Sequence, residues 1–299
     1  MSEEILLKNT DKKKSIFDLK RSEIIKRFEQ KGVIIFREFD IVAKKIKKFT
    51  DLFTETYAKD ALRRKKRLND SDIRDVDYQE NIHGEPQAVD LHSEASFAPA
   101  WPEIIWFYCI TPPQTGGASI LCDGAELWNY LSAKNKIFFL FNPIRYELEI
   151  PIGIKKRGKG KSPWMLNSLG TGNGFINWKT GIFHLTLQRL AVQEGRNSNQ
   201  LCFANHLFIT LDSEPQLIKR TMFDGKKIAK NILKEIHCKA NELTYEHNWK
   251  KGDLIMLDNK RFLHGRRKYK KNDPRDIIVI QSAKASFGYG STTRNRIDR

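Results

Sequence analysis

The stretch from Gly252 to Arg266 reads GDLIMLDNKRFLHGR and contains a strong strand signal. An apolar run of strand length, Leu254 to Leu257, follows the turn residues Gly252 and Asp253. Such a run between turn signals is typical of a buried strand. Four polar residues come next, and a second apolar segment then carries His264. We therefore predict a strand over Asp253–Leu257 that places His264 directly beside a sheet.

A histidine followed two residues later by an acidic residue occurs twice, as His83-Gly84-Glu85 and as His92-Ser93-Glu94. Seven histidines and 36 acidic residues in 299 positions give about 0.8 such pairs by chance, so the pattern alone carries little weight. The first pair lies in polar text with a glycine inside it, whereas the second precedes a strong apolar run, Ile104–Ile110. In an extended segment, side chains at i and i+2 share one face. The context therefore favours His92 and Glu94 as a pair that a sheet holds in place.

A site with two histidines and one carboxylate needs a second histidine from elsewhere in the chain, and His264 is the best candidate. His184 and His206 compete with it. Each lies among apolar residues, where a structural core histidine is the commoner outcome. His237 and His247 stand in polar text, so we expect them at the surface.

Periodicity predicts further elements along the chain. Helical spacing of apolar residues appears over Ser15–Gly32, Ile41–Leu62 and Asp212–Lys239. Strand signals appear over Val33–Phe36, Ile104–Ile110, Ser119–Leu121, Ile137–Phe141, Arg145–Ile150 and Ile277–Ile280. The basic, glycine-rich stretch over about 152–174 is predicted to be a long loop or lid within a single domain spanning residues 1–299.

Composition excludes several classes of protein. Hydrophobic residues make up 40% of the chain, which excludes global disorder, and no apolar run approaches the roughly 20 residues of a membrane span. Four scattered cysteines indicate neither a disulfide framework nor a zinc knuckle. The acidic start, MSEEILLK, does not resemble a secretory signal, so we expect a cytoplasmic protein without a membrane partner.

The net charge of +17 suits several kinds of partner. A nucleic-acid-binding protein would use Arg63–Arg67 and the lysines of Lys155–Lys161, but neither cluster is interleaved with aromatic residues and no nucleic-acid-binding motif accompanies them. A zinc hydrolase could use His92, Glu94 and His264, although the usual H-E-x-x-H helix is missing. Both alternatives stay open at this point.

The motifs resemble those of the iron(II)- and 2-oxoglutarate-dependent dioxygenases of the taurine dioxygenase and clavaminate synthase-like superfamily. The resemblance spans Val33 to Arg275. It rests on Leu91-His92-Ser93-Glu94, Gly116-Gly117-Ala118-Ser119, Trp249 with Gly252-Asp253, Asp258-Asn259, Phe262–Arg266 and Arg275, in this order. The implied fold is mainly β with flanking helices, a double-stranded β-helix or jelly-roll barrel.

The resemblance also implies the roles of individual residues. His92, Glu94 and His264 would bind iron(II), with 2-oxoglutarate and dioxygen as co-substrates. Arg275, eleven residues after His264, would hold the distal carboxylate of 2-oxoglutarate with help from Ser119. The substrate pocket would draw on Gln87, Phe97 and Arg266.

The implied reaction is oxidation of an unactivated C–H bond. Glu94 in place of the commoner aspartate matches biosynthetic members of the family, and a carboxylate at this position argues for oxygenation rather than halogenation. Val279 stands where taurine dioxygenases carry a second arginine, which disfavours taurine. The basic charge suits an anionic, amino-acid-derived small molecule, either free or attached to an acidic carrier protein. Hydroxylation, desaturation and a kainoid-synthase type of cyclisation all fit these residues.

Overall fold

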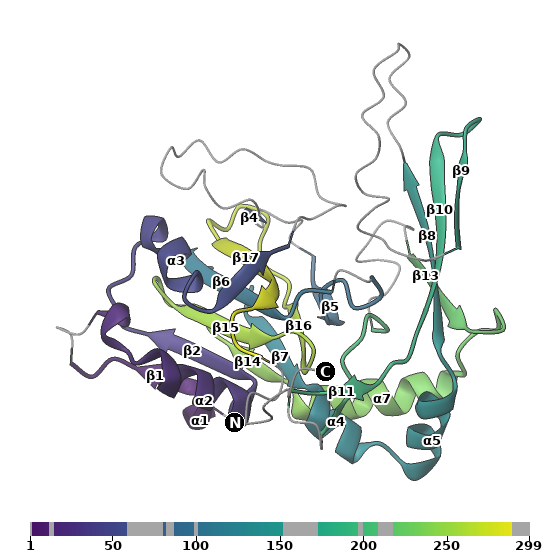
Figure 1. Cartoon of the computed structure of the whole chain (residues 1–299), viewed down its shortest axis with the longest axis horizontal. Coiled ribbons are helices and arrows are strands. Elements are labelled where there is room, and N and C mark those ends of the chain that lie inside the picture. Colours follow the sequence, from purple (N-terminus) through teal and green to yellow (C-terminus); the bar gives the residue numbers. More distant parts are fainter. Residues whose placement is uncertain are drawn as a thin grey trace, which may run out of the picture.

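The computed structural model describes residues 2–11, 15–58, 80–81, 87–98, 101–151, 173–196, 200–208 and 218–288. Within them the chain is mainly β-structure with helices packed against it (Figure 1). The helices are α1 (Ser2–Ile5), the 3-10 helix η1 (Ile16–Asp18), α2 (Arg21–Lys31), α3 (Ala43–Thr50), α4 (Gly124–Tyr130), α5 (Ala133–Phe141) and α7 (Lys230–Leu243). The mainly β fold class predicted from the sequence is confirmed.

A seven-stranded sheet forms one wall of the jelly-roll barrel. Its order is β1-β2-β15-β6-β17-β3, and β4 pairs with β17 beside this path. The strands are β1 (Leu6–Lys8), β2 (Val33–Arg37), β3 (Thr54–Tyr57), β4 (Glu80–Asn81), β6 (Ile104–Thr111), β15 (Leu254–Asp258) and β17 (Asp276–Ala285). The strands predicted over Val33–Phe36, Asp253–Leu257, Ile104–Ile110 and Ile277–Ile280 are therefore confirmed.

The large sheet is buried on both faces, which explains why its strands read as continuous apolar runs. Successive side chains of a strand point to opposite faces. Along β2, Ile34 and Phe36 pack with residues of α2 and α3, whereas Val33 and Ile35 face the interior between the sheets. The helices therefore cover the outer face and leave the inner face for the barrel.

A four-stranded sheet, β14-β7-β16-β5, forms the opposite wall. Its strands are β5 (Val89–His92), β7 (Ser119–Asp123), β14 (Tyr245–His247) and β16 (Phe262–Arg266). Leu121 and Phe262 of this sheet share an apolar cluster with Phe107 and Leu257 of the large sheet. This cluster joins the two walls, and β5 and β16 carry the candidate histidines.

A third sheet stands beside the barrel, with α5 and α7 at its base (Figure 1). Its order is β13-β8-β10-β9, with β8 (Ile144–Pro151), β9 (Asn173–Asn177), β10 (Ile182–Arg189) and β13 (Ile218–Met222). A short pair, β11 (Gln193–Glu194) and β12 (Leu201–Cys202), follows β10. One apolar cluster includes Leu91 and Leu263 of the barrel together with Tyr146 and Leu185 of this sheet, so the two parts pack against each other.

The helix predicted over Ile41–Leu62 is wrong in its second half. It ends at Thr50, and Thr54–Tyr57 forms β3, which pairs with β17 at the edge of the large sheet. Two threonines and a tyrosine favour a strand once a partner edge is available. Tertiary pairing therefore overrides the helical spacing in this segment.

The strand predicted over Ile137–Phe141 is wrong, because this segment is the end of α5. Ser132 caps the helix by accepting a hydrogen bond from the backbone N–H of Asn135 at 3.4 Å. The cap lies outside the apolar run, so inspection of the run alone could not find the helix.

The helix predicted over Asp212–Lys239 is partly wrong. Its first described residues, Ile218–Met222, form β13, which pairs with β8, and α7 begins only at Lys230. Apolar residues of both elements enter one cluster, which is why their spacing reads as one long helical face. The predicted basic loop falls largely on residues 152–172, outside the described part of the chain.

Three further expectations concern the surface and the core. Cys109, Cys122 and Cys202 are buried and free, whereas Cys238 is free but exposed. Of the helices that the structure describes, none combines the length and apolar character that crossing a bilayer requires. His247, expected at the surface, is buried, with 1% of its side chain exposed.

A buried carboxylate explains the position of His247. Asp253 accepts hydrogen bonds from Arg37 Nε at 2.9 Å and Nη2 at 2.6 Å, and its Oδ2 lies 3.1 Å from His247 Nε2. Burial alone would raise the pKa of the Asp253 carboxyl, but hydrogen bonds from His247, Arg37 and the Lys250 N–H outweigh it and hold the pKa below the usual 3.8. Asp253 thereby ties β2, β14 and the start of β15 together.

We expect Asp253→Asn to lower the free energy of unfolding by about 3 kcal/mol near neutral pH, because Arg37 loses its charged partner in a buried position. The folded-state pKa of Asp253 is lowered, so its contribution is fully present above about pH 5 and is lost as the pH falls below 3.8. Urea denaturation of the parent and the variant between pH 3 and pH 8 measures this difference. Asp224→Asn, which alters an exposed pair with Lys226, is the control and should change little. The account would be contradicted if the difference in the free energy of unfolding between the parent and Asp253→Asn became larger as the pH falls.

Candidate metal centre and co-substrate site

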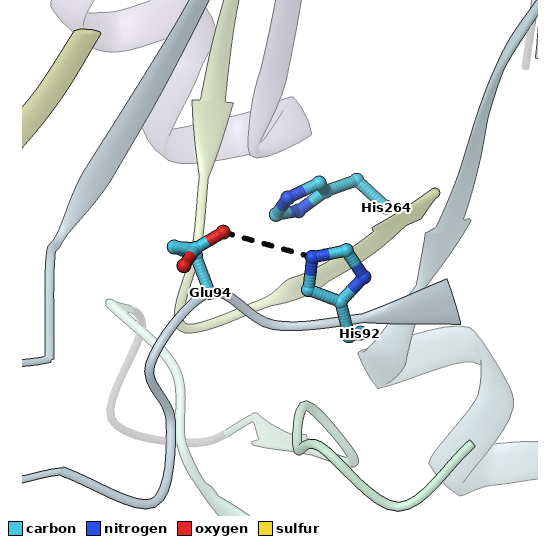
Figure 2. Close-up of side chains that lie close together, drawn as sticks. All are labelled: His92, Glu94 and His264. Carbon is cyan, nitrogen blue, oxygen red and sulfur yellow. Dashed lines mark ion pairs between the residues drawn. The ribbon is translucent and has the colours of Figure 1, made fainter. Parts of the chain in front are cut away.

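Two neighbouring side chains, His92 and Glu94, meet the distant His264 at the β5–β16 edge of the four-stranded sheet. His92 ends β5, Glu94 follows it in a turn, and His264 lies in the middle of β16. One ligand atom from each lies within 4.8 Å of the other two (Figure 2). Among the residues that the structure describes, this is the group of histidine, cysteine and acidic side chains placed closely enough to share a metal ion. The structure thus brings together the three side chains that the sequence analysis selected as candidate metal ligands.

The pairing of β5 with β16 sets this geometry. His264 lies directly opposite His92 in the antiparallel register, and the two rings are 4.4 Å apart between centroids. Gly265 permits the close approach, because a Cβ atom there would lie 2.5 Å from the Val89 carbonyl oxygen and 2.9 Å from that of Asp90. The glycine after the second histidine is thus a requirement of the strand pair.

Hydrogen bonding fixes the His92 ring. Its Nδ1 lies 2.9 Å from the backbone oxygen of Asp90. A carbonyl oxygen only accepts, so Nδ1 carries the proton and Nε2 offers its lone pair. Nε2 lies 3.6 Å from Oε2 of Glu94, as the dashed line in Figure 2 marks. This arrangement of a backbone-oriented imidazole beside a carboxylate is typical of metal-binding histidines.

Asn259 holds the turn that carries Glu94. Its side-chain oxygen accepts a hydrogen bond from the Glu94 N–H at 2.8 Å, and its Nδ2 donates to the carbonyl oxygens of Glu94 and Pro102, each at 2.9 Å. The Ser93 hydroxyl donates to the Asn259 carbonyl at 2.5 Å. Ala95 adopts a left-handed backbone with φ of 53°, a conformation that costs a residue other than glycine about 1 kcal/mol or more. The hydrogen bonds of Asn259 therefore stabilise the strained turn that carries Glu94.

The donor set fits a divalent transition metal. Two neutral imidazoles and one carboxylate are the ligands of non-haem iron(II) oxygenases, and they leave coordination positions open. The same set also suits catalytic zinc, so the surroundings of the site have to distinguish the two.

Arg275 provides one distinguishing feature. It is buried, its Nε donates to the Gly117 carbonyl at 3.2 Å, and its Nη1 has no hydrogen-bond partner within the described residues. Burial, followed by the charge of Arg266, lowers the pKa of Arg275 to about 10, so it stays charged near neutral pH. Gly117 has a φ of 66°, and a Cβ there would meet the Arg275 side chain at 3.2 Å. A buried cation with an unused donor is suited to an anionic ligand.

Arg266 and Ser119 lie in the same region. They face each other across the β16 and β7 pair, and both are buried. The Arg266 guanidinium lies 4.9 Å from the centre of the Tyr269 ring, and that of Arg275 lies 5.7 Å from the same centre. Burial lowers the pKa of Arg266. The Ser119 hydroxyl accepts a hydrogen bond from Trp249 Nε1 at 3.1 Å. The guanidinium groups of Arg266 and Arg275 thus both lie close to Tyr269, which follows β16, the strand that carries His264.

Gln87 and Phe97 occupy different environments. The side chain of Gln87 is exposed, and the residue contributes its backbone carbonyl, which accepts a hydrogen bond from Arg266 Nη2 at 3.0 Å. Phe97 is buried, with its ring 5.7 Å from that of Tyr146 and 5.1 Å from that of His206. Phe97 is therefore part of the apolar core, and His206 lies between it and His92.

The two histidines that competed with His264, and the second histidine–carboxylate pair, lie in different places. His184 lies on β10, where its ring stacks on Phe175, and it does not join the cluster. His206 is buried as expected, but its ring lies 5.4 Å from that of His92, so it adjoins the site. The pair His83 and Glu85 lies outside the described residues.

Sequence reasoning considered His206 only as a rival metal ligand and assigned no role at the site to Asn259 or Tyr269. Asn259 was part of the quoted Asp258-Asn259 motif, and its position at the turn before His264 was the available signal. Tyr269 follows His264 by five residues in basic text, which gives no such signal.

The chain is similar to known oxygenases over most of its length. Residues 9–163 and 187–281 match the sequence profile of the family described as "Taurine catabolism dioxygenase TauD, TfdA family". A curated relative, 3-((Z)-2-isocyanoethenyl)-1H-indole synthase of Fischerella ambigua, is 22% identical over 191 residues, which cover 63% of this chain and 61% of that protein.

Solved structures share the fold. AAD-2 in complex with Mn(II) and N-oxalylglycine gives a TM-score of 0.60 at 17% identity, with 95% of each chain covered. PvcB, described as an Fe, alpha-ketoglutarate dependent oxygenase from an isonitrile synthetic pathway, gives 0.56 at 14% identity and covers 92% of this chain and 84% of its own. A putative alpha-ketoglutarate dependent 2,4-D dioxygenase from Burkholderia xenovorans gives 0.58 at 16% identity, with 93% and 92% covered. The jelly-roll core is therefore the fold of these proteins.

We expect Gly265→Ala to weaken metal binding as well as stability. The added methyl group would overlap two backbone oxygens of β5, which costs about 1–3 kcal/mol and pushes the two histidine strands apart. Thermal melting and titration with Mn(II) measure the two effects. Gly225→Ala is the control: its φ of 85° adds a backbone strain that Gly265→Ala does not have, but nothing lies within 4 Å of the added Cβ, so this variant lacks the steric overlap. Parental Mn(II) affinity in Gly265→Ala would contradict the proposed role of the close approach.

We expect Asn259→Ala to lower Mn(II) affinity about tenfold to a hundredfold, because the turn carrying Glu94 loses its side-chain anchor. Isothermal titration with Mn(II) measures the change. Asn142→Ala, which removes a single hydrogen bond to the Phe138 carbonyl, is the control and should bind Mn(II) as the parent does. Equal affinities in the two variants would show that Asn259 has no role in positioning Glu94.

Proposed function

We propose that this chain, which belongs to the taurine catabolism dioxygenase TauD, TfdA family, is an iron(II)- and 2-oxoglutarate-dependent dioxygenase. Its proposed reaction is oxidation of an unactivated C–H bond of an anionic, amino-acid-derived small molecule in a biosynthetic pathway. The convergence of His92, Glu94 and His264 carries this proposal. The similarity to an isonitrile-pathway oxygenase and to an isocyanoethenyl-indole synthase supports a biosynthetic role.

In this proposal His92, Glu94 and His264 hold the iron. The Asp90 carbonyl keeps His92 in the tautomer that presents Nε2, and Asn259 keeps the Glu94 carboxylate beside it. Iron bound there would couple the oxidative decarboxylation of 2-oxoglutarate by dioxygen to oxidation of the substrate. The protein supplies the ligands, excludes excess water and orients the substrate.

Arg275 would bind the distal carboxylate of 2-oxoglutarate. Its Nη1 is buried with an unused proton, and a guanidinium pairs well with a carboxylate. The second cation, Arg266, adds positive potential on the same side, and Ser119 is its partner in the register of β16 with β7. This pair of buried arginines favours an oxygenase over a zinc hydrolase, which has no need of a dicarboxylate site.

The nature of the substrate follows from two features. Val279 is buried, and it stands where taurine dioxygenases carry a sulfonate-binding arginine, so a sulfonate is disfavoured. The net charge of +17 raises the local concentration of anions around the molecule. We therefore propose a carboxylate-bearing substrate, either hydroxylated, desaturated or cyclised.

The test is the visible spectrum of metal-free protein supplied anaerobically with iron(II) and 2-oxoglutarate. We expect a charge-transfer band in the parent and none in His92→Ala. In Arg275→Ala the 2-oxoglutarate concentration for half-maximal absorbance should rise about tenfold to a hundredfold, since a charge-assisted hydrogen bond is lost. His184→Ala, altered outside the cluster, is the control. Absence of the band in the parent, together with no stoichiometric iron binding, would contradict the proposal.

A further inference from the structure

His206 is a buried histidine that the proposed iron and 2-oxoglutarate contacts do not use. It lies in the segment Asn205–Phe208, and its ring is 5.4 Å from that of His92 and 5.1 Å from that of Phe97. Arg266 and Arg275 belong to the barrel, on β16 and just before β17, whereas the contacts of His206 include groups of the third sheet. His206 therefore borders the metal ligands with support that is separate from the proposed co-substrate contacts.

Arg220 of β13 fixes the His206 ring. Its Nη2 lies 2.9 Å from His206 Nδ1, and its Nε donates to the His206 carbonyl at 2.6 Å. A guanidinium has hydrogen-bond donors only, so Nδ1 must accept, and the ring proton is on Nε2. The ring is neutral and offers one donor, Nε2–H.

The backbone around His206 is also fixed. The Ser93 N–H donates to the Asn205 carbonyl at 2.8 Å, which ties the segment to the residue between His92 and Glu94. The Asn205 side chain donates to the Ala191 carbonyl at 2.9 Å and accepts from the Leu207 N–H at 2.9 Å. A donor held in this way loses little freedom when it binds a ligand, which is the requirement for a specificity contact.

We propose that His206, oriented by Arg220, determines substrate specificity by donating a hydrogen bond from Nε2 to a carboxylate of the organic substrate. This inference rests on the function proposed above and identifies His206 as the group that recognises the substrate's negative charge. Arg220 contributes in two ways, because it keeps Nδ1 an acceptor and places a positive charge behind the ring. Phe97 packs edge-on against the same ring and provides an apolar neighbour for the bound substrate in this proposal.

The test measures binding without turnover. The protein is loaded with Mn(II) and N-oxalylglycine and is then titrated calorimetrically. The titrants are the proteinogenic L-amino acids and their N-acetyl derivatives, each compared with its own C-terminal amide. The quantity compared is the ratio of dissociation constants, amide over acid, for the same side chain. We expect a ratio above ten for at least one acid in the parent, and a fall of about tenfold or more in His206→Phe, which keeps a ring but has no donor.

Two further variants separate the contact from simple packing. His206→Gln, which retains an N–H donor, should recover part of the ratio, and Arg220→Lys should lower it because the paired contact to Nδ1 and the carbonyl is lost. His237→Phe on α7, which makes the same chemical change beside Phe208 instead of His92, is the control. N-oxalylglycine should bind all four variants as it binds the parent.

The inference is overturned if no acid in the parent binds more tightly than its amide, or if the ratio is unchanged in both His206→Phe and Arg220→Lys. Failure of the proposed function would look different. The parent would then give no charge-transfer band with iron(II) and 2-oxoglutarate, whereas failure of the present inference leaves that band intact and alters only the reading of substrate charge.

Discussion

The antiparallel pairing of β5 with β16 is the constraint on which the site depends. It places His92 directly opposite His264, and it requires glycine at position 265 because two carbonyl oxygens of β5 occupy the space a side chain would take. The pair in turn relies on the barrel, in which the two walls share one apolar cluster. Ligand geometry is therefore a property of the sheet register, which a one-residue slip would destroy.

Buried polar side chains hold the segments around the site in place. Asn259 holds the Glu94 turn, Asp253 joins three strand ends, and Arg275 keeps an unused donor in a buried position. The first two are satisfied by protein groups, and a partly unsatisfied group such as Arg275 costs free energy unless a ligand completes it. Binding of the co-substrate to Arg275 is therefore expected to stabilise the folded protein.

The sequence predicted the core strands and the three converging side chains because both leave local signals. Apolar runs at Ile104–Ile110 and Leu254–Leu257 mark strands buried on both faces. Elements whose identity depends on distant partners were predicted wrongly: Thr54–Tyr57 is a strand only because β17 offers an edge, and His247 is buried only because Asp253 is. His206 could not be assigned to the site from the sequence, since nothing local reveals that its segment bonds to Ser93.

The measurement that tests the central claim most directly is a crystal structure of the protein with Mn(II) and N-oxalylglycine, with the metal located by anomalous scattering. The account predicts one metal ion bound by His92 Nε2, Glu94 and His264, with the distal carboxylate of N-oxalylglycine on the Arg275 guanidinium. A metal ion bound elsewhere, or a carboxylate that does not contact Arg275, would contradict it.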